Sequence, residues 1–243
     1  MSNRGCVRHY NSSADDDTLA STEYDTALDA AEVFWDDPLV AGCTVGTTNK
    51  YSTFGYTILG AALEAAAGKP IDQLVVDELT NPYGLGTLRP ENLDDTSVDR
   101  SKMYETDNDE AVPDQVSWKV LGGGMESSAA DLAMFGQKLL AGQIISPLAR
   151  EYMWTGTPWS DYAYGWQLES ETAPDGDAHR LIGKNGAWRI GSDAWLQTYP
   201  DDGVVIAVLS NRYGDHANDG VQTSNNSEVL GRAIGTTVLA TLP

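Results

Sequence analysis

The sequence predicts an α+β protein in which an antiparallel β-sheet is flanked by helices. Apolar residues recur at helical spacing through much of residues 21–160, strand-like segments follow one another after residue 160, and a helical segment closes the chain at about 226–240. We therefore expect one domain over residues 1–243. It would comprise a loose segment at 1–20, a mainly helical part at 21–160, and strands with a last helix at 161–243.

Periodicity, caps and stop signals predict the helices before residue 160. A helix over 23–35 turns Trp35 toward the core. The stretch YSTFGYTILGAALEAAAG begins a helix near its hydroxyl residues and ends it at Gly68. Ser128 and Asp131 fit a capping box for a later helix. The expected helices are 23–35, 54–67, 71–79, one within 121–142, and 147–153.

The second half of the chain carries strand signals after a long polar loop. Residues 89–118 are acidic and lack a clear period, which is typical of a binding loop or lid. Short connections between the later segments imply antiparallel pairing, and PDDG at 200–203 is a tight hairpin turn. The expected strands are 162–170, 178–184, 187–200 and 203–211.

The charge and hydropathy of the chain limit its partners. Its net charge is −21, from 36 acidic and 15 basic residues, which argues against nucleic acid or an anionic membrane surface as partner. The acidic surface fits a salt-adapted protein and an ordinary acidic protein equally well. No apolar run approaches the ~20 residues of a membrane span, and the first residues lack the apolar core of a signal peptide. We expect a soluble chain without an export signal.

Cysteine and histidine patterns exclude several kinds of site. Cys6 and Cys43 are expected to be free thiols, although a disulfide would form in an oxidising compartment. His9, His179 and His216 are isolated from one another in the sequence, and no CxxC, HExxH, GxxxxGK[ST] or GxSxG occurs. We therefore expect neither a metal nor an organic cofactor.

Two short stretches carry residues suited to acyl transfer, a reaction that needs a nucleophile, a base and oxyanion donors. Tyr51 follows Lys50 and precedes a helix, whose N-terminus adds positive potential. A tyrosine serves as a base where nearby cations lower its phenol pKa. Lys184, in GKNG, is expected where one strand ends and the next begins. Taken alone, the first stretch is more often a helix N-cap and the second more often a turn.

The order of the motifs is more specific than any one of them. Five stretches follow in sequence: RGCVRHY; YSTFGYTILGAALEAAAGKPIDQLV, preceded by Gly46-Thr47; NPYGLGTLRPEN; GGGMESSAADLAMFGQKLLAG; and YGWQL with GKNGAWRIGSDAWLQTYPDDGVVIAVLSN. Together they resemble the serine β-lactamase-related family, which includes class C β-lactamases, D-alanyl-D-alanine carboxypeptidases and related esterases. The resemblance runs from about residue 4 to residue 240. It implies a β-lactamase/transpeptidase-like fold and hydrolysis of esters or amides, lactams included, through an acyl-enzyme.

The resemblance also assigns roles. Tyr51 matches the family's general base, and Lys184 matches the third motif, Lys-Thr-Gly or His-x-Gly, which lines the substrate site. Gly186 completes that motif, and the backbone N–H of Ala187 matches one oxyanion donor. The implied partner is a small-molecule or peptide-like acyl substrate, and family members are often periplasmic or secreted.

Two substrate-binding positions depart from the family pattern. Thr53 stands where the family usually has the asparagine that holds the acyl side chain, and its side chain has a shorter reach. Asn185 stands where threonine or serine is common. Both differences affect which substrate the resemblance implies, and they affect the hydrolysis of lactams most of all.

The family nucleophile lies in Ser-x-x-Lys, upstream of the Arg-His-Tyr segment, and no Ser-x-x-Lys occurs here. Thr47-Thr-Asn-Lys50 falls in the loop before Tyr51, and the family uses the Ser52 position structurally. The resemblance therefore implies an N-terminally truncated domain. Three explanations remain open: a fragment of a longer gene, a non-hydrolytic descendant that binds ligands, or a different nucleophile. A homo-oligomer or a partner segment would then cover the exposed core.

Overall fold

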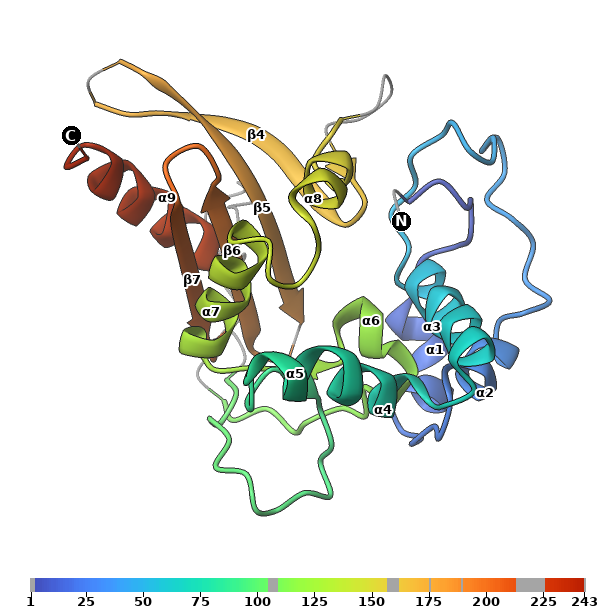
Figure 1. The fold of residues 1–243 in the computed structure, drawn as a ribbon. Helices are drawn as coiled ribbons and strands as arrows, with labels where there is room; N and C mark the ends of the chain where they lie inside the picture. Colours follow the sequence, from blue (N-terminus) through green and yellow to red (C-terminus); the bar gives the residue numbers. More distant parts are fainter. Residues whose placement is uncertain are drawn as a thin grey trace. The chain divides into compact units, whose positions relative to one another are not determined.

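The computed structural model describes residues 3–104, 109–156, 162–174, 176–188, 190–212 and 226–242 (Figure 1). The chain divides into two compact units, and each is treated by itself. Unit 1 comprises Met1–Val98 and Asp114–Ser127, and unit 2 comprises Asp99–Pro113 and Ser128–Pro243. Helices combine with an antiparallel sheet, so the predicted α+β class is confirmed. Within the described ranges, no helix is long and apolar enough to cross a bilayer.

Unit 1 is mainly helical. Its only described strand pair joins β1 to β2, with Arg89 opposite Glu126. The elements of unit 1 are α1 (Ser12–Leu19), α2 (Ala27–Glu32), α3 (Thr53–Ala67), α4 (Ile71–Val75), the π-helical turn η1 (Val76–Thr80), α5 (Asn81–Tyr83), β1 (Arg89–Pro90), η2 (Ser117–Lys119), α6 (Val120–Gly123) and β2 (Met125–Glu126).

Helix α3 is the central helix of unit 1, and its ends follow the local sequence. Ser52 caps its start by accepting the Gly55 N–H at 3.0 Å. Gly68 ends it in the left-handed conformation with φ 70°, which only glycine adopts without strain. The buried face of α3 presents Phe54, whose ring stacks on Phe34 with centroids 3.8 Å apart and meets the Trp118 ring edge-on.

The buried carboxylate of Glu64 joins α3 to the starts of two other helices. Its Oε1 accepts the Ala27 N–H at 2.8 Å and the Ile71 N–H at 2.9 Å, and its Oε2 accepts the Leu28 N–H at 3.2 Å. These are N-terminal amides of α2 and α4, which no intrahelical carbonyl can satisfy. The negative charge also lies at the positive ends of both helices, where it is favourable.

The structure corrects three expectations for unit 1. Residues 1–20 are not loose throughout, because α1 occupies Ser12–Leu19 and buries Leu19 completely. Trp35 does not enter the core but is 61% exposed, since α2 ends at Glu32 and the chain leaves the helix before it. The helix expected at 71–79 continues through η1 and α5 to Tyr83, because Pro82 falls in the first turn of α5, where no N–H is needed.

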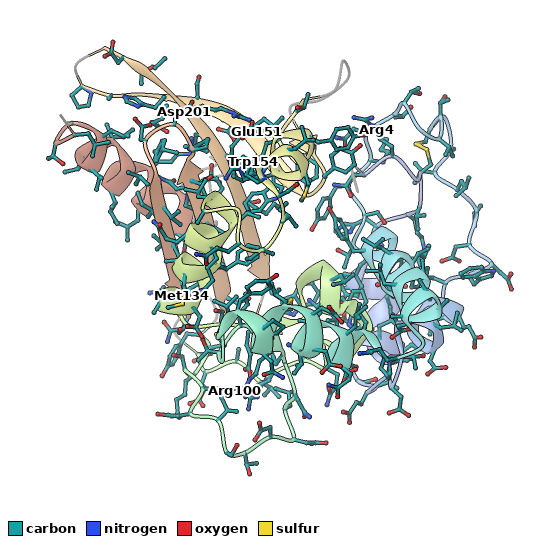
Figure 2. The ribbon with its side chains drawn as sticks, in the orientation of Figure 1. Arg4, Arg100, Met134, Glu151, Trp154 and Asp201 are labelled. Carbon is teal, nitrogen blue, oxygen red and sulfur yellow. A yellow bond between two sulfur atoms is a disulfide. The ribbon has the colours of Figure 1, made fainter. Side chains whose placement is uncertain are left out.

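Cys6 and Cys43 form a disulfide, so the expectation of free thiols is wrong. Backbone hydrogen bonds bring the two segments together independently of the sulfurs: the Val40 N–H donates to the Cys6 carbonyl at 2.9 Å, and the Gly46 N–H donates to the Arg4 carbonyl at 2.9 Å. Arg4 is labelled beside this region in Figure 2. The disulfide therefore joins two segments that backbone hydrogen bonds also hold together.

Unit 2 contains a sheet with strand order β3-β4-β5-β6-β7, in which every adjacent pair is antiparallel. The predicted meander is thus confirmed. The elements of unit 2 are α7 (Ala129–Leu140), α8 (Pro147–Met153), β3 (Tyr162–Ala163), β4 (Trp166–Thr172), β5 (Ala178–Trp188), β6 (Ser192–Tyr199), β7 (Val204–Ser210) and α9 (Asn226–Leu239).

Helices α7 and α9 pack on opposite faces of this sheet (Figure 1). A Cβ on Gly136 of α7 would meet Val205 at 2.6 Å, whereas one on Gly231 of α9 would meet Trp195 at 2.4 Å. Alternate residues of a strand face opposite sides, so Trp195 and its neighbour Leu196 belong to separate core clusters.

Helix α8 is held against β5 by one arginine. Figure 2 labels Glu151 and Trp154, and Arg180 donates to the Glu151 carboxylate at 2.9 Å and to the Trp154 carbonyl at 3.2 Å. The Trp154 ring meets the Trp166 ring edge-on in the core below. The sequence places α8 correctly at 147–153, and tertiary contacts fix its orientation.

Two strand boundaries differ from the prediction. The segment 162–170 is broken by a hairpin at Tyr164 and Gly165, both with positive φ, which suits a tight turn between twisted strands. Strand β5 runs on through Lys184 to Trp188, so Lys184 lies within a strand and not between two. The turn comes at Gly191 instead, with φ 106°, where a Cβ would come within 2.5 Å of the Tyr104 backbone.

Candidate active site

The first candidate site lies at the start of α3 in unit 1. Tyr51 immediately precedes the helix and is 54% exposed. The Ser52 hydroxyl makes two structural hydrogen bonds. It accepts from the Gly55 N–H and donates to the Arg8 carbonyl at 2.7 Å. Ser52 is therefore an N-cap and a tie to the preceding segment, as its family position implies.

Thr53 is buried against a residue that the sequence argument did not place in the site. Its backbone N–H donates to His9 Nδ1 at 3.3 Å, and its hydroxyl oxygen lies 3.4 Å from the same nitrogen. The His9 ring meets the Tyr51 ring edge-on, with centroids 4.9 Å apart. The signal that could have found His9 was its place in the Arg-His-Tyr segment of the family resemblance.

Lys184 lies on β5 in unit 2, where its ammonium group is partly buried. Its Nζ donates to the Asn185 carbonyl at 2.6 Å and to Asn185 Oδ1 at 2.9 Å, and lies 5.9 Å from the Tyr162 ring centroid. Burial lowers the pKa of Lys184 to about 8, and the negative charge of Glu228 opposes part of this shift. The site therefore holds an ammonium that an anion would stabilise.

The strand beyond Lys184 has an open side. Strand β4 pairs with β5 only as far as Gly183, whereas β6 continues opposite Gly186 and Ala187. Over the described residues, this end of β5 has one strand neighbour, and both Gly186 and Ala187 are exposed. A strand edge of this kind can offer backbone N–H groups to a ligand.

The predicted site residues thus fall into two groups. Tyr51 and Thr53 lie together in unit 1 with His9, and the segment from Lys184 to Ala187, including Asn185 and Gly186, lies together in unit 2. The described residues contain no cluster of three or more side chains that could hold a metal ion.

The other hydroxyl and histidine candidates have local roles or lie outside the description. The Thr47 hydroxyl donates to the Thr44 carbonyl in the loop before Tyr51. His179 Nδ1 lies 3.0 Å from an Asp202 oxygen, across a hairpin of the sheet. His216 is outside the described residues.

Comparison with known proteins identifies the family of this chain. A family model described as Beta-lactamase matches residues 11–230. The mouse (Mus musculus) serine beta-lactamase-like protein LACTB, mitochondrial, is 24% identical over 232 residues, covering 78% of this chain and 41% of its own length. The chain therefore spans about two fifths of that relative.

Solved structures share the fold at low sequence identity. The octameric penicillin-binding protein homologue from Pyrococcus abyssi superposes with a TM-score of 0.70 at 20% identity, covering 89% of this chain and 48% of its own. The D-amino acid amidase from Ochrobactrum anthropi SV3 gives 0.71 at 16% identity, covering 100% and 71%. Because the Beta-lactamase model matches most of the sequence and the fold agrees, this chain belongs to the beta-lactamase family.

Proposed function

We propose that this chain is a serine hydrolase-type domain that cleaves an ester or amide bond, in a peptide-like or lactam substrate, through an acyl-enzyme. Tyr51 would take the proton of the attacking hydroxyl as general base. The Ala187 N–H would donate to the developing oxyanion from the open side of β5. Lys184 would orient the substrate through a carboxylate. Thr53, Asn185 and Gly186 are the positions that the family resemblance assigns to substrate binding.

The observation that carries this proposal is the environment of Lys184. With a pKa of about 8, its amine is mostly protonated at neutral pH. The described residues give its Nζ two oxygens of Asn185 but no carboxylate within ion-pair distance. A substrate carboxylate would therefore gain a charge-assisted hydrogen bond without displacing another ion.

The names of the matched proteins support acyl substrates of this class. One is a D-amino acid amidase and another is a penicillin-binding protein homologue. The homologue is described as octameric, which supports a homo-oligomer here as a proposal. Several exposed apolar side chains, such as Trp35 and Leu39, would suit another subunit or a partner segment.

Hydrolysis of p-nitrophenyl acetate by the purified chain tests the base. We expect Tyr51→Phe to lower kcat/KM by about 10²- to 10⁴-fold, the usual contribution of a positioned general base. Tyr24→Phe is the matched control, because it removes a phenol of the same unit whose hydroxyl donates to the Thr18 carbonyl. Equal rates for the wild type and Tyr51→Phe would refute the assigned role.

A second candidate is a ligand-binding protein on the same scaffold, which the lack of a Ser-x-x-Lys motif in these 243 residues favours. It makes a different prediction for the same protein. A carboxylate-bearing acyl ligand would bind, with loss of affinity in Lys184→Met, while no ester is turned over. Isothermal titration beside the hydrolysis assay separates the two functions.

A further inference from the structure

Two consecutive residues of the N-terminal segment attach to the start of α3. The Arg8 carbonyl accepts from the Ser52 hydroxyl, and the His9 imidazole accepts from the Thr53 N–H. The Thr53 amide belongs to the first turn of α3, where N–H groups have no intrahelical acceptor. His9 thus supplies an acceptor that the helix itself lacks.

This hydrogen bond fixes the state of the imidazole. Because Nδ1 accepts the Thr53 N–H, it cannot carry a proton, and the neutral ring holds its proton on Nε2. The same ring packs edge-on against Tyr51, with an interplanar angle of 68°. One imidazole therefore contacts both the first amide of α3 and the side chain just before it.

The geometry points to His9 as a positioning residue for Tyr51: its neutral ring holds the start of α3 and the Tyr51 side chain together, and protonation of the ring releases them. A protonated Nδ1 would face the Thr53 N–H donor to donor. It would also place a positive charge at the positive end of α3. The role of Tyr51 as base rests on the proposed function, whereas the contact itself does not.

The charges around His9 agree with a neutral ring near neutral pH. Partial burial lowers the pKa of His9 below its ordinary value, and the negative charge of Asp15 on α1 opposes this. Arg8 neutralises much of that charge, since its guanidinium binds Asp15 at 2.8 Å and Asp37 at 2.5 Å. Among the described residues, Asp15 acts on the imidazole through its charge and Tyr51 through its ring.

The direction of the pH effect follows. A histidine whose pKa is lower in the folded state than in the unfolded state stabilises the fold when its ring is neutral. The contact is therefore at full strength above about pH 6.5. It is lost as the pH falls through the lower pKa of His9. The Tyr51 environment should therefore change with the titration of His9 and not with that of another histidine.

NMR titration of the full chain tests this coupling without any substrate. The sequence contains three histidines, so ring signals are assigned by single variants, and Tyr51 signals by Tyr51→Phe. We expect the Tyr51 ring signals to shift with the midpoint of His9, and Thr53 amide exchange to accelerate over the same pH range. His179, which pairs with Asp202, is the internal control.

Two variants distinguish the role of His9 as hydrogen-bond acceptor from the role of its aromatic ring. In His9→Asn, the side-chain oxygen can replace Nδ1, so Thr53 should stay protected while Tyr51 loses its pH response. In His9→Phe, the ring remains without an acceptor, and Thr53 should exchange roughly 2- to 12-fold faster. Tyr51 signals that stay constant through the His9 titration, or an unchanged Thr53 rate in His9→Phe, would overturn the inference.

A negative result for the role of His9 can be told apart from a negative result for the proposed function. If Tyr51 follows His9 in the spectra and Tyr51→Phe leaves hydrolysis unchanged, the contact stands and the catalytic role of Tyr51 falls. If Tyr51→Phe abolishes hydrolysis and the spectra show no coupling, Tyr51 is the base and His9 does not position it.

Discussion

Replacing Glu64 by alanine should destabilise unit 1 more than any surface substitution, because one carboxylate serves the starts of α2 and α4. Three N–H groups, of Ala27, Leu28 and Ile71, lose their acceptor in Glu64→Ala. The Ala27 and Ile71 bonds are buried and the Leu28 bond is partly buried, so water cannot easily replace the carboxylate. At roughly 1–3 kcal/mol for each of the two buried donors left unsatisfied, the expected loss is about 2–6 kcal/mol.

Glu64→Gln provides a graded comparison. The glutamine oxygen can still accept from Ala27 and Ile71, which both bond to Oε1 in the wild type. Its amide nitrogen would face the Leu28 N–H, and the charge at the helix ends is lost. The expected cost is about 1–2 kcal/mol.

Urea unfolding followed by circular dichroism measures both values. Glu78→Ala is the control, because Glu78 is exposed on the neighbouring π-helical turn and should change stability by no more than about 0.5 kcal/mol. A loss below about 1 kcal/mol in Glu64→Ala, or equal losses in the alanine and glutamine variants, would refute the assignment of Glu64 as a shared helix cap.

Three further predictions concern the disulfide, Lys184 and the surface charge. Cys6→Ser with Cys43→Ser should cost about 4 kcal/mol of unfolding free energy for a separation of 37 residues, and a loss under about 1 kcal/mol would show that the backbone pairing suffices. Trinitrobenzenesulfonate should modify Lys184 with a midpoint near pH 8. Lys102 should react with a much higher midpoint, because Glu110 raises its pKa. Peptide mapping of both sites measures the two midpoints, and equal values would contradict the prediction. The melting temperature should rise in molar KCl because salt screens a net charge of −21, and a flat or falling curve would argue against salt adaptation.

Local signals made much of the fold predictable. Helix α3 is set by its Ser52 cap and its Gly68 stop, and α7 by Ser128, which accepts the Asp131 N–H as the capping box predicts. The antiparallel order of the sheet follows from short connections between strands. These features depend on residues close together in the chain.

The features that escaped prediction depend on residues far apart in sequence. The turn after β5 contains Gly191, where the Tyr104 backbone passes too close for a side chain, and nothing near Gly191 in the sequence encodes that approach. The disulfide depends on pairing between the segments around Cys6 and Val40. Glu64 looks like a surface residue of an alanine-rich helix until the amides of α2 and α4 are placed beside it.

The candidate site divides in the same way. Residue types and motif order identified Tyr51 and Lys184, but not the surroundings that determine their chemistry. The low pKa of Lys184 comes from burial, and the contact of Tyr51 with His9 comes from a segment more than forty residues away. These surroundings are set by tertiary contacts, which the local sequence does not encode.

The central claim is that this chain has the chemistry of a serine hydrolase, and covalent labelling tests it most directly. The purified chain is incubated with a broad serine-reactive phosphonate and its intact mass is measured. The account predicts one stable adduct per chain, formed about 10²- to 10⁴-fold more slowly in Tyr51→Phe than in Tyr24→Phe, with peptide mapping to identify the labelled hydroxyl. Folded protein that forms no adduct, or that labels equally fast without the Tyr51 phenol, would contradict it.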